Sequence, residues 1–199
     1  MKNRQIVIEA PSKTSDPTEA RILDAAAALI ATHGIDGLTV TEVARRAGVS
    51  RPTVYRRWAG TDELVRATLL RTTLALIERI DDEPSSREEL VDAVLRFTEL
   101  FRADSLYRSL LEHEPEVFTR YSLLRIGSSQ RALLLWLGAA IARAQKRDEV
   151  RTGEPADIAV MLLLIAQSAI LSHRSVSALI DAKTLDVQLR AAVDGYLRP

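Results

Sequence analysis

The sequence of 199 residues contains no cysteine, which excludes a disulfide framework and thiolate chemistry and is compatible with the cytoplasm, where we expect the chain. Long apolar runs are also lacking. The longest charge-free apolar stretch, residues 158–172, has 15 residues, whereas a bilayer span needs about 18. The apolar run at residues 6–8 is too short for a secretory signal. We therefore expect neither a membrane segment nor a signal peptide.

The chain has little of what enzymes use. Its three histidines, His33, His113 and His173, fall on different predicted helices without metal-ligand spacing, and no glycine-rich phosphate loop is present. The acids at positions 112, 114 and 116 flank Pro115, and we interpret them as a capped, solvated turn between helices. We expect no catalytic residue, no metal and no cofactor. A helical enzyme is the weaker alternative.

Net charge is zero, but it is unevenly distributed. Residues 1–71 hold 11 basic and 8 acidic side chains, and residues 72–199 hold 16 and 19. Residues 40–60 contain five arginines and one acid, Glu42, and end in the stretch GVSRPTVYRRW. A small segment with concentrated positive charge is the pattern expected of a polyanion contact.

Capping signals and apolar repeats at helical spacing predict an all-α chain. The first helix begins after Asp16 and ends near Gly34. The second begins at a T-x-x-E capping box, Thr39 to Glu42, and ends at Ala47. Residues 1–15 precede the first cap and are predicted to be disordered.

Ser50 is predicted to cap a third helix that ends near Trp58, and a fourth begins near Thr61. The fourth carries an apolar stripe at helical spacing: Leu64, Ala67, Leu70, Leu74 and Ile77. Later helices are predicted over residues 87–103, 105–113, 116–147 with a break near 127–129, 155–174 and 185–197.

Residues 39–58 have helix-turn-helix spacing, with a glycine turn at Gly48. Small and apolar positions let the two helices pack at an angle: Val43, Ala44, Val49, Val54 and Trp58. Polar positions then face outward from the second helix: Arg51, Thr53, Tyr55, Arg56 and Arg57. A protruding helix fits the major groove of DNA, where an arginine can bond guanine, so Arg51 and Tyr55 are the best base-edge candidates. The competing interpretation is a solvated basic helix in an ordinary bundle.

The stretch GLTVTEVARRAGVSRPTVYRRWAGTDELV, residues 37–65, resembles the DNA-binding domain of the TetR family of bacterial transcriptional regulators. The resemblance is strong over residues 18–68. It implies an N-terminal three-helix DNA-binding domain over residues 16–60 and a C-terminal helical ligand-binding and dimerisation domain over residues 61–199. It also implies that double-stranded DNA is a partner.

The resemblance implies a role for individual residues as well. Base edges or the groove are assigned to Thr41, Arg51, Pro52, Tyr55 and Arg56, and phosphates to Thr39, Ser50, Tyr55 and Arg57. Where family members often carry lysine at the start of the fourth helix, this chain has Thr61, so one charged phosphate contact is replaced by a hydroxyl or N–H. Arg45 and Arg46 either compensate for it or are plain solvent-facing charges.

Residues 155–179 are apolar nearly all round, which predicts a helix that is central or that buries its outer face on a partner. With the helix at 185–197 it would form half of a four-helix bundle in a homodimer. A two-fold dimer also suits a palindromic operator. The alternative is that this helix is simply the centre of the monomer.

In the family, the C-terminal domain binds a small molecule in a pocket formed by the middle helices. The candidate ligand-binding residues are the aromatic side chains of those helices and two polar anchors: Phe97, Phe101, Tyr107, Phe118, Tyr121, Trp136, His113 and Gln167. Aromatic side chains at helical spacing are more often core than ligand contacts, and Gln167 and His113 also suit a core or capping role. The mixture favours a largely apolar effector.

Together these patterns predict a repressor that a ligand releases from DNA through the fourth helix, residues 61–80. An effector-independent architectural DNA-binding protein is the alternative.

Overall fold

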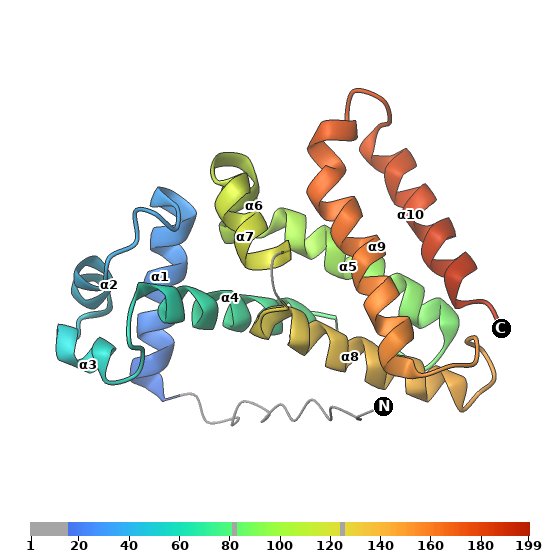
Figure 1. Cartoon of the computed structure of the whole chain (residues 1–199), viewed down its shortest axis with the longest axis horizontal. Helices are drawn as coiled ribbons and strands as arrows, with labels where there is room; N and C mark the ends of the chain where they lie inside the picture. The colour runs from blue at the N-terminus through green and yellow to red at the C-terminus, as the bar shows by residue number, and fades with distance from the viewer. Residues whose placement is uncertain (1–15, 81–82, 124–125) are drawn as a thin grey trace.

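The computed structural model describes residues 16–80, 83–123 and 126–199, so the predicted disordered tail lies outside the described residues. In the described part of the chain all regular secondary structure is helical, which confirms the predicted fold class (Figure 1). The helices are α1 (Pro17–His33), α2 (Val40–Ala47), α3 (Arg51–Tyr55), α4 (Thr61–Glu78), α5 (Arg87–Ala103), α6 (Ser105–His113), α7 (Pro115–Leu123), α8 (Ser128–Gln145), α9 (Pro155–Val176) and α10 (Ala182–Leu197).

Side-chain caps begin most of these helices. The Asp16 carboxylate accepts a hydrogen bond from the Thr18 amide at 2.9 Å, and Ser86 forms a complete capping box with Glu89. The box predicted at Thr39 is only half made. Thr39 accepts from the Glu42 amide at 3.2 Å, but the Glu42 carboxylate pairs with Arg45 one turn on, so that part of the prediction is wrong.

Two helix boundaries also differ from the predicted ones. The α-helix α3 ends at Tyr55, although a bond from the Trp58 amide to the Val54 carbonyl (3.0 Å) carries a helical turn further. α10 begins at Ala182 rather than near residue 185, because the Asp181 carboxylate accepts from the Thr184 amide at 2.9 Å and starts the helix there.

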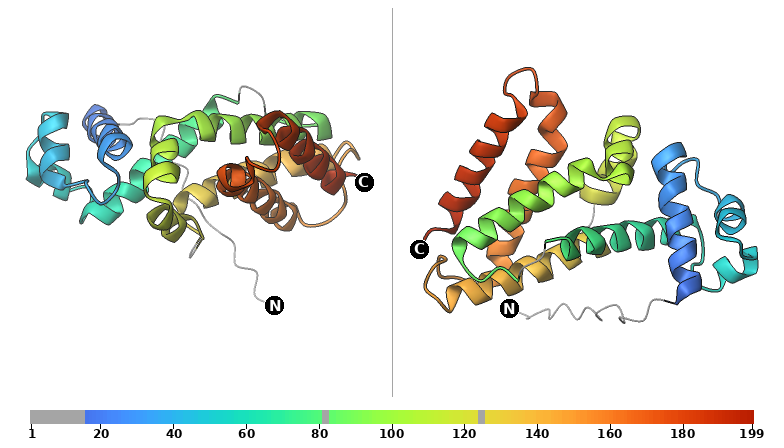
Figure 2. Two further views of the ribbon diagram at one scale, coloured as in Figure 1. Left: turned by 90° about the horizontal axis from the view of Figure 1, so that it is seen from above. Right: turned by 180° about the vertical axis from the view of Figure 1, so that it is seen from behind.

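α4 connects two regions (Figures 1 and 2). Helices α1 to α3 gather around its N-terminal end, and we call these three helices the head. The helices α5 to α10 surround the rest, and we call them the body. Arg71 of α4 fixes this junction, since it donates to the Ala20 carbonyl at 2.6 Å and pairs with Asp24 at 2.8 Å.

The buried face of α4 differs from the predicted stripe. Leu64 is buried as expected, but Leu70 and Leu74 are half-buried. Residues outside the predicted stripe, Leu69 and Thr73 among them, are buried instead. The difference arises because α4 packs on α1 at one end and on α5 and α8 at the other, so no single face is buried along its whole length. The prediction of a single buried stripe along the whole of α4 is therefore wrong.

α9 is the central packing helix of the body, against α5, α8 and α10. Among the described helices it alone is long and apolar enough to cross a bilayer, and a third of its most apolar window is buried. A core helix passes the same test, so this is weak evidence for a span. One face of α9 remains exposed and apolar: Val160, Met161 and Leu164. The helix is thus not enclosed by its own chain.

Candidate DNA-binding face and ligand pocket

The turn between α2 and α3 is built on Gly48, whose left-handed backbone (φ 66°, ψ 38°) ends α2. The following amide, that of Val49, bonds the Ala44 carbonyl at 3.0 Å and folds the chain back. Ala44, Val54 and Trp58 are buried at the contact between the two short helices. The structure therefore builds the helix-turn-helix that the sequence spacing predicts.

The opposite side of α3 faces solvent. Arg51 and Arg56 are exposed, as is Pro52, and the Tyr55 side chain is 54% exposed although it is aromatic. Thr41 of α2 is exposed as well. More than half of this tyrosine is exposed between exposed arginines, so this face is available to a partner.

Three of the residues predicted to meet phosphates, Thr39, Ser50 and Thr61, lie at helix N-termini. Thr39 and Ser50 use their hydroxyls as N-caps, and the Ser50 and Thr53 hydroxyls also bond each other at 2.8 Å. Thr61 opens α4. Backbone N–H groups at the start of each helix point out beside these hydroxyls, which is the arrangement that favours an anion.

Carboxylates partner some of the arginines. Arg57 pairs with Asp16, the cap of α1, and Arg45 pairs with Glu42. Within the described residues no salt bridge involves the exposed Arg46, Arg51 or Arg56. The positive charge predicted for residues 40–60 is therefore concentrated on these three arginines.

The Asp16 carboxyl is held in its ionised form. Its pKa is lowered first by the hydrogen bond from the Thr18 amide and then by the Arg57 guanidinium. Arg57 is thus engaged inside the head, with one of its nitrogens on Asp16.

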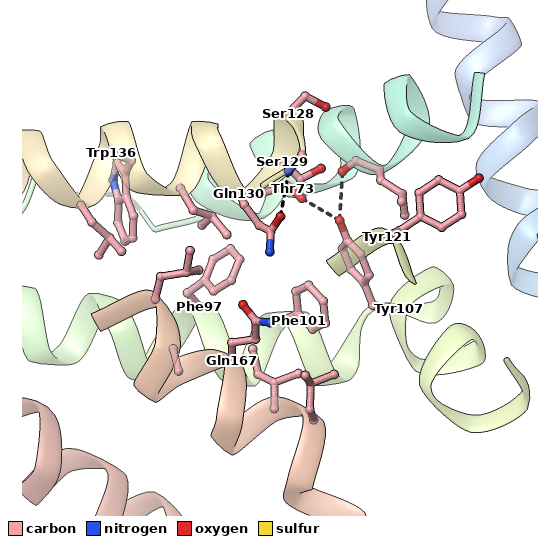
Figure 3. Close-up of a pocket in the computed structure, with 18 of the residues that line it drawn as sticks. Thr73, Phe97, Phe101, Tyr107, Tyr121, Ser128, Ser129, Gln130, Trp136 and Gln167 are labelled. Carbon is pink, nitrogen blue, oxygen red and sulfur yellow. Dashed lines mark hydrogen bonds between the residues drawn. The ribbon is translucent and has the colours of Figure 1, made fainter. Parts of the chain in front are cut away.

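A cavity of about 110 Å³ lies in the body, between α4 and the helices α5 to α9 (Figure 3). Its walls are mostly apolar. Among the predicted ligand-binding residues, those that line it are Phe97, Phe101, Tyr107, Phe118, Tyr121, Trp136 and Gln167. His113 does not. It is exposed at the end of α6, with Nδ1 3.2 Å from the Ser109 carbonyl, so the structure does not bring it to the pocket.

Sequence reasoning missed several polar residues of the cavity: Arg66, Thr73, Ser128, Ser129 and Gln130. Gln130 is buried and accepts from the Gly127 amide at 2.9 Å. In Figure 3 the amide groups of Gln130 and Gln167 both point into the space between the helices. The signal for this set was the serine-glutamine run after Gly127, which the sequence pattern marked only as a helix break.

Tyr107 is a fixed part of the wall. Its hydroxyl donates to the Leu69 carbonyl at 2.9 Å and lies 2.6 Å from the Thr73 hydroxyl, while its ring stacks on Phe101 at 3.8 Å. Burial raises the pKa of this phenol far above its usual value, so it is neutral. Tyr107 therefore joins α6 to α4 and offers a ligand mainly its ring.

Glu114, between α6 and α7, does not lie in a solvated turn. Its carboxylate accepts hydrogen bonds from the amides of Ile35 (2.6 Å) and Asp36 (3.3 Å), just after α1. The interpretation of this acid as part of a capped solvent turn is wrong, because the turn docks on the head. On α7, the Tyr121 hydroxyl donates to Asp62 of α4 at 3.0 Å. In the described residues no group of three or more acidic or histidine side chains is placed to hold a metal ion.

Three comparisons bear on the helix-turn-helix and on the whole chain. The sequence profile of the family described as "Bacterial regulatory proteins, tetR family" matches residues 22–68. An HTH-type transcriptional regulator of Mycobacterium tuberculosis is 38% identical over 180 residues, which is 90% of this chain and 94% of the relative.

Two solved structures share the fold. The transcriptional repressor QsdR of Rhodococcus erythropolis, from the TetR family, superposes with a TM-score of 0.67 at 20% identity, over 94% of this chain and 98% of the other. FadR of Bacillus subtilis, solved with stearoyl-CoA, gives 0.63 at 16% identity, over 90% and 99%.

Proposed function

Because the chain belongs to the TetR family of bacterial transcriptional regulators, we propose that it binds a palindromic DNA operator as a homodimer and represses transcription. The observation that carries this proposal is the two-sidedness of α3. Val54 is fully buried, whereas Arg51 and Tyr55 on the same short helix are exposed. A helix held from behind in this way can enter the major groove without unfolding its support.

In this proposal residues 16–60 form the DNA-binding domain. Base edges and the groove are contacted by Thr41, Arg51, Pro52, Thr53, Tyr55 and Arg56. Phosphates are contacted by Thr39, Ser50, Arg57 and Thr61, together with Tyr55, through hydroxyls, one guanidinium and helix N-terminal amides. Arg46 is exposed beside this face and adds to its positive potential.

Residues 61–199 form the second domain, which dimerises through α9 and α10. The exposed apolar side chains of α9, Val160, Met161 and Leu164, support this, as does Val187 of α10, which is 55% exposed. An apolar face of this kind is unfavourable in water and marks an interface. The alternative, that α9 is only the centre of the monomer, does not account for its exposed face.

The cavity takes a small, largely apolar effector. Its aromatic walls and its few polar side chains, Gln167 among them, have the composition of small-molecule pockets. The stearoyl-CoA named with FadR of B. subtilis is consistent with an effector that has a large apolar part. The effector acts through α4, which lines the pocket and packs on the head. We infer a cytoplasmic, non-enzymatic protein that needs no cofactor.

Selection from random DNA duplexes by the purified full chain tests the DNA part of this proposal. We expect one palindromic sequence to be enriched, with half-sites about one helical turn or a multiple of it apart. Arg51→Ala should lose this enrichment, and Arg147→Ala, in the turn after α8, is the matched control that should keep it. Binding without any sequence preference would instead make the protein an architectural DNA-binding protein.

Coupling to an effector has its own test. A compound that releases the selected duplex must bind more weakly to the DNA-bound protein by the same factor by which it weakens DNA binding. Titrations by calorimetry with and without the duplex measure both factors. Equal affinities in the two titrations would refute release through the pocket.

A further inference from the structure

Helix α7 is a pocket wall with a polar contact near each end, one to the head and one to the first turn of α4. Phe118 and Tyr121 of α7 line the cavity. Immediately before α7, Glu114 accepts hydrogen bonds from the amides that follow α1, and in its last turns Tyr121 donates to Asp62 of α4. We call Glu114 and Tyr121, with these bonds, the α7 latch. The segment from Glu114 to Tyr121 thus connects the ligand space to the head and to the start of α4.

The Glu114 contact is closely fitted. The Ile35 amide lies 2.6 Å from one carboxylate oxygen and the Asp36 amide 3.3 Å from the other, so both oxygens are engaged. Gly34 leaves the space for them, since a Cβ there would collide with the carboxylate, and its φ of 73° also favours glycine. A charged acceptor on two backbone donors is among the stronger hydrogen-bond arrangements.

The Tyr121 contact reaches the start of α4, just beyond the head. Asp62 lies in the first turn of α4, next to Thr61, which is one of the proposed phosphate contacts. The Tyr121 ring stands in the pocket wall while its hydroxyl holds Asp62 at 3.0 Å. Figure 3 shows this side chain at the head-facing end of the pocket. A displacement of the ring is therefore a displacement of its bond to α4.

Because the cavity is small, a wall must move to admit a drug-sized effector. Drug-sized ligands occupy pockets of about 300–1,000 Å³, whereas a cavity of about 150 Å³ takes only a benzene-sized molecule. This cavity has about 110 Å³. α8 packs extensively on α4 and α9, and α5 packs on α4 and α9 as well, whereas α7 is short and packs chiefly on α6. An effector larger than benzene therefore displaces α7 more easily than any other wall.

From these contacts we infer that the α7 latch holds the head in its DNA-binding arrangement, and that an effector releases DNA by pushing α7 outward and breaking both ends of the latch. This inference rests on the proposed function and adds a second route to the head beside the shift of α4. It assigns positioning roles, without DNA contact, to Glu114 and Tyr121.

Glu114→Gln is the sharpest test. An amide keeps the size of the side chain but removes the charge that binds the two backbone donors. We expect the affinity for the selected duplex to fall about tenfold, within the range of 5- to 150-fold typical of allosteric coupling. Loss of a negative charge by itself strengthens binding to DNA, so a weakening cannot come from the general field. Glu116→Gln, two residues on and exposed, is the matched control and should bind DNA as tightly as the parent chain or tighter.

Tyr121→Phe keeps the ring in the wall and removes the bond to Asp62. It should also weaken binding several-fold, with Tyr196→Phe on α10 as its control. If both contacts act through one displacement of α7, the double variant should bind no more weakly than the weaker single variant, because the effects are not additive. The salt dependence of binding should stay unchanged in all of them, since no phosphate contact is removed.

Amide hydrogen exchange separates this inference from the proposed function. Exchange at Ile35 and Asp36 should become several-fold faster in Glu114→Gln and also in Tyr121→Phe, which touches neither amide. Unchanged exchange at these amides in Tyr121→Phe would overturn the latch even if the parent chain selected no DNA at all. Faster exchange with undiminished DNA affinity would overturn it too, because the contact would then only stabilise the fold. Failure of the parent chain to bind any duplex would count against the proposed function alone.

Discussion

The head and the pocket differ in how far apart in the sequence their interacting residues lie. The helix-turn-helix uses residues 39–61, and its caps, its glycine turn and most of its hydrogen bonds join residues at most five positions apart. The pocket is lined by residues from Arg66 to Leu171, brought together by packing among six helices. A face specified locally keeps its geometry wherever the head moves, whereas a cavity specified by packing changes with any one of its walls. This difference suits a head that reads DNA and a body that responds to a ligand.

The two tryptophans give the largest effect that can test this comparison. Trp58 is buried behind α3, and Trp136 is half-buried in the pocket wall. Trp58→Ala should destabilise the head by about 3–5 kcal/mol, the usual loss for a buried tryptophan, and abolish DNA binding. Trp136→Ala should cost less, because part of its ring is already in solvent. Urea denaturation monitored by circular dichroism measures both. An equal loss for the two would mean that the pocket wall is as tightly packed as the head.

Within the head, the arginines should separate by role. Arg51→Ala should remove about 1–3 kcal/mol of discrimination at one base position. Arg57→Ala should weaken binding to all sequences alike. It should lower the salt slope by about one phosphate's worth. Fluorescence anisotropy on the selected duplex and its single-base variants, at several salt concentrations, distinguishes the two. A change of base preference in Arg57→Ala alone would reverse the assignment.

Helix caps of the two regions should have similar effects on stability but different effects on function. Thr39→Ala and Ser86→Ala each remove a side-chain cap and should each lower the free energy of unfolding by about 1 kcal/mol. Only Thr39→Ala should also weaken DNA binding, since Ser86 lies in the body. Thermal denaturation and anisotropy on the same samples check this. Weakened DNA binding in Ser86→Ala would show that α5 is coupled to the head more directly than the contacts indicate.

The smallest effect concerns two aspartate caps and pH. The pKa of Asp16 and that of Asp181 both lie below their ordinary value of 3.8 in the folded chain, in each case first because of a hydrogen bond from the backbone. A lowered pKa means that each carboxylate stabilises the fold above its ordinary pKa, and that this contribution is lost as the pH falls through the folded value.

Asp181→Asn should therefore have a lower Tm than the parent chain at pH 7, and this difference should be smaller near pH 3. Asp16→Asn should behave likewise and should also tighten DNA binding at pH 7, because it releases Arg57 from its partner. A Tm difference that persists at pH 3 would show that the charge of the cap is not what stabilises α10.

The sequence predicted those parts of the molecule that depend on neighbours along the chain. The caps at Asp16, Ser50 and Ser86, the turn at Gly48 and the buried Val54 all follow from local patterns, and the structure has them. The aromatic side chains predicted on the middle helices all line the pocket, but they are six of its 22 lining residues. Whether those side chains bind an effector, and whether the outward residues of α3 bind DNA, stays a prediction.

Three of the failures, at His113, Glu114 and the stripe on α4, depended on partners distant in sequence. His113 and Glu114 are adjacent residues at a helix end, and nothing in the local pattern says that the first points to solvent while the second binds amides 79 positions away. The stripe on α4 failed because the helix changes packing partners along its length. The capping box at Thr39 failed for a local reason. The Glu42 carboxylate can bond either the Thr39 amide or Arg45, and in the structure it pairs with Arg45.

Gly34 and Glu114 have a consequence for the comparison of related sequences. A side chain at position 34 would strain the backbone and take the place of the carboxylate, and without the carboxylate the Ile35 and Asp36 amides lose their acceptor. The carboxylate of Glu114 therefore depends on the glycine at position 34. Across relatives these two positions should therefore change together, and a chain with a bulky residue at the first should lack the acid at the second.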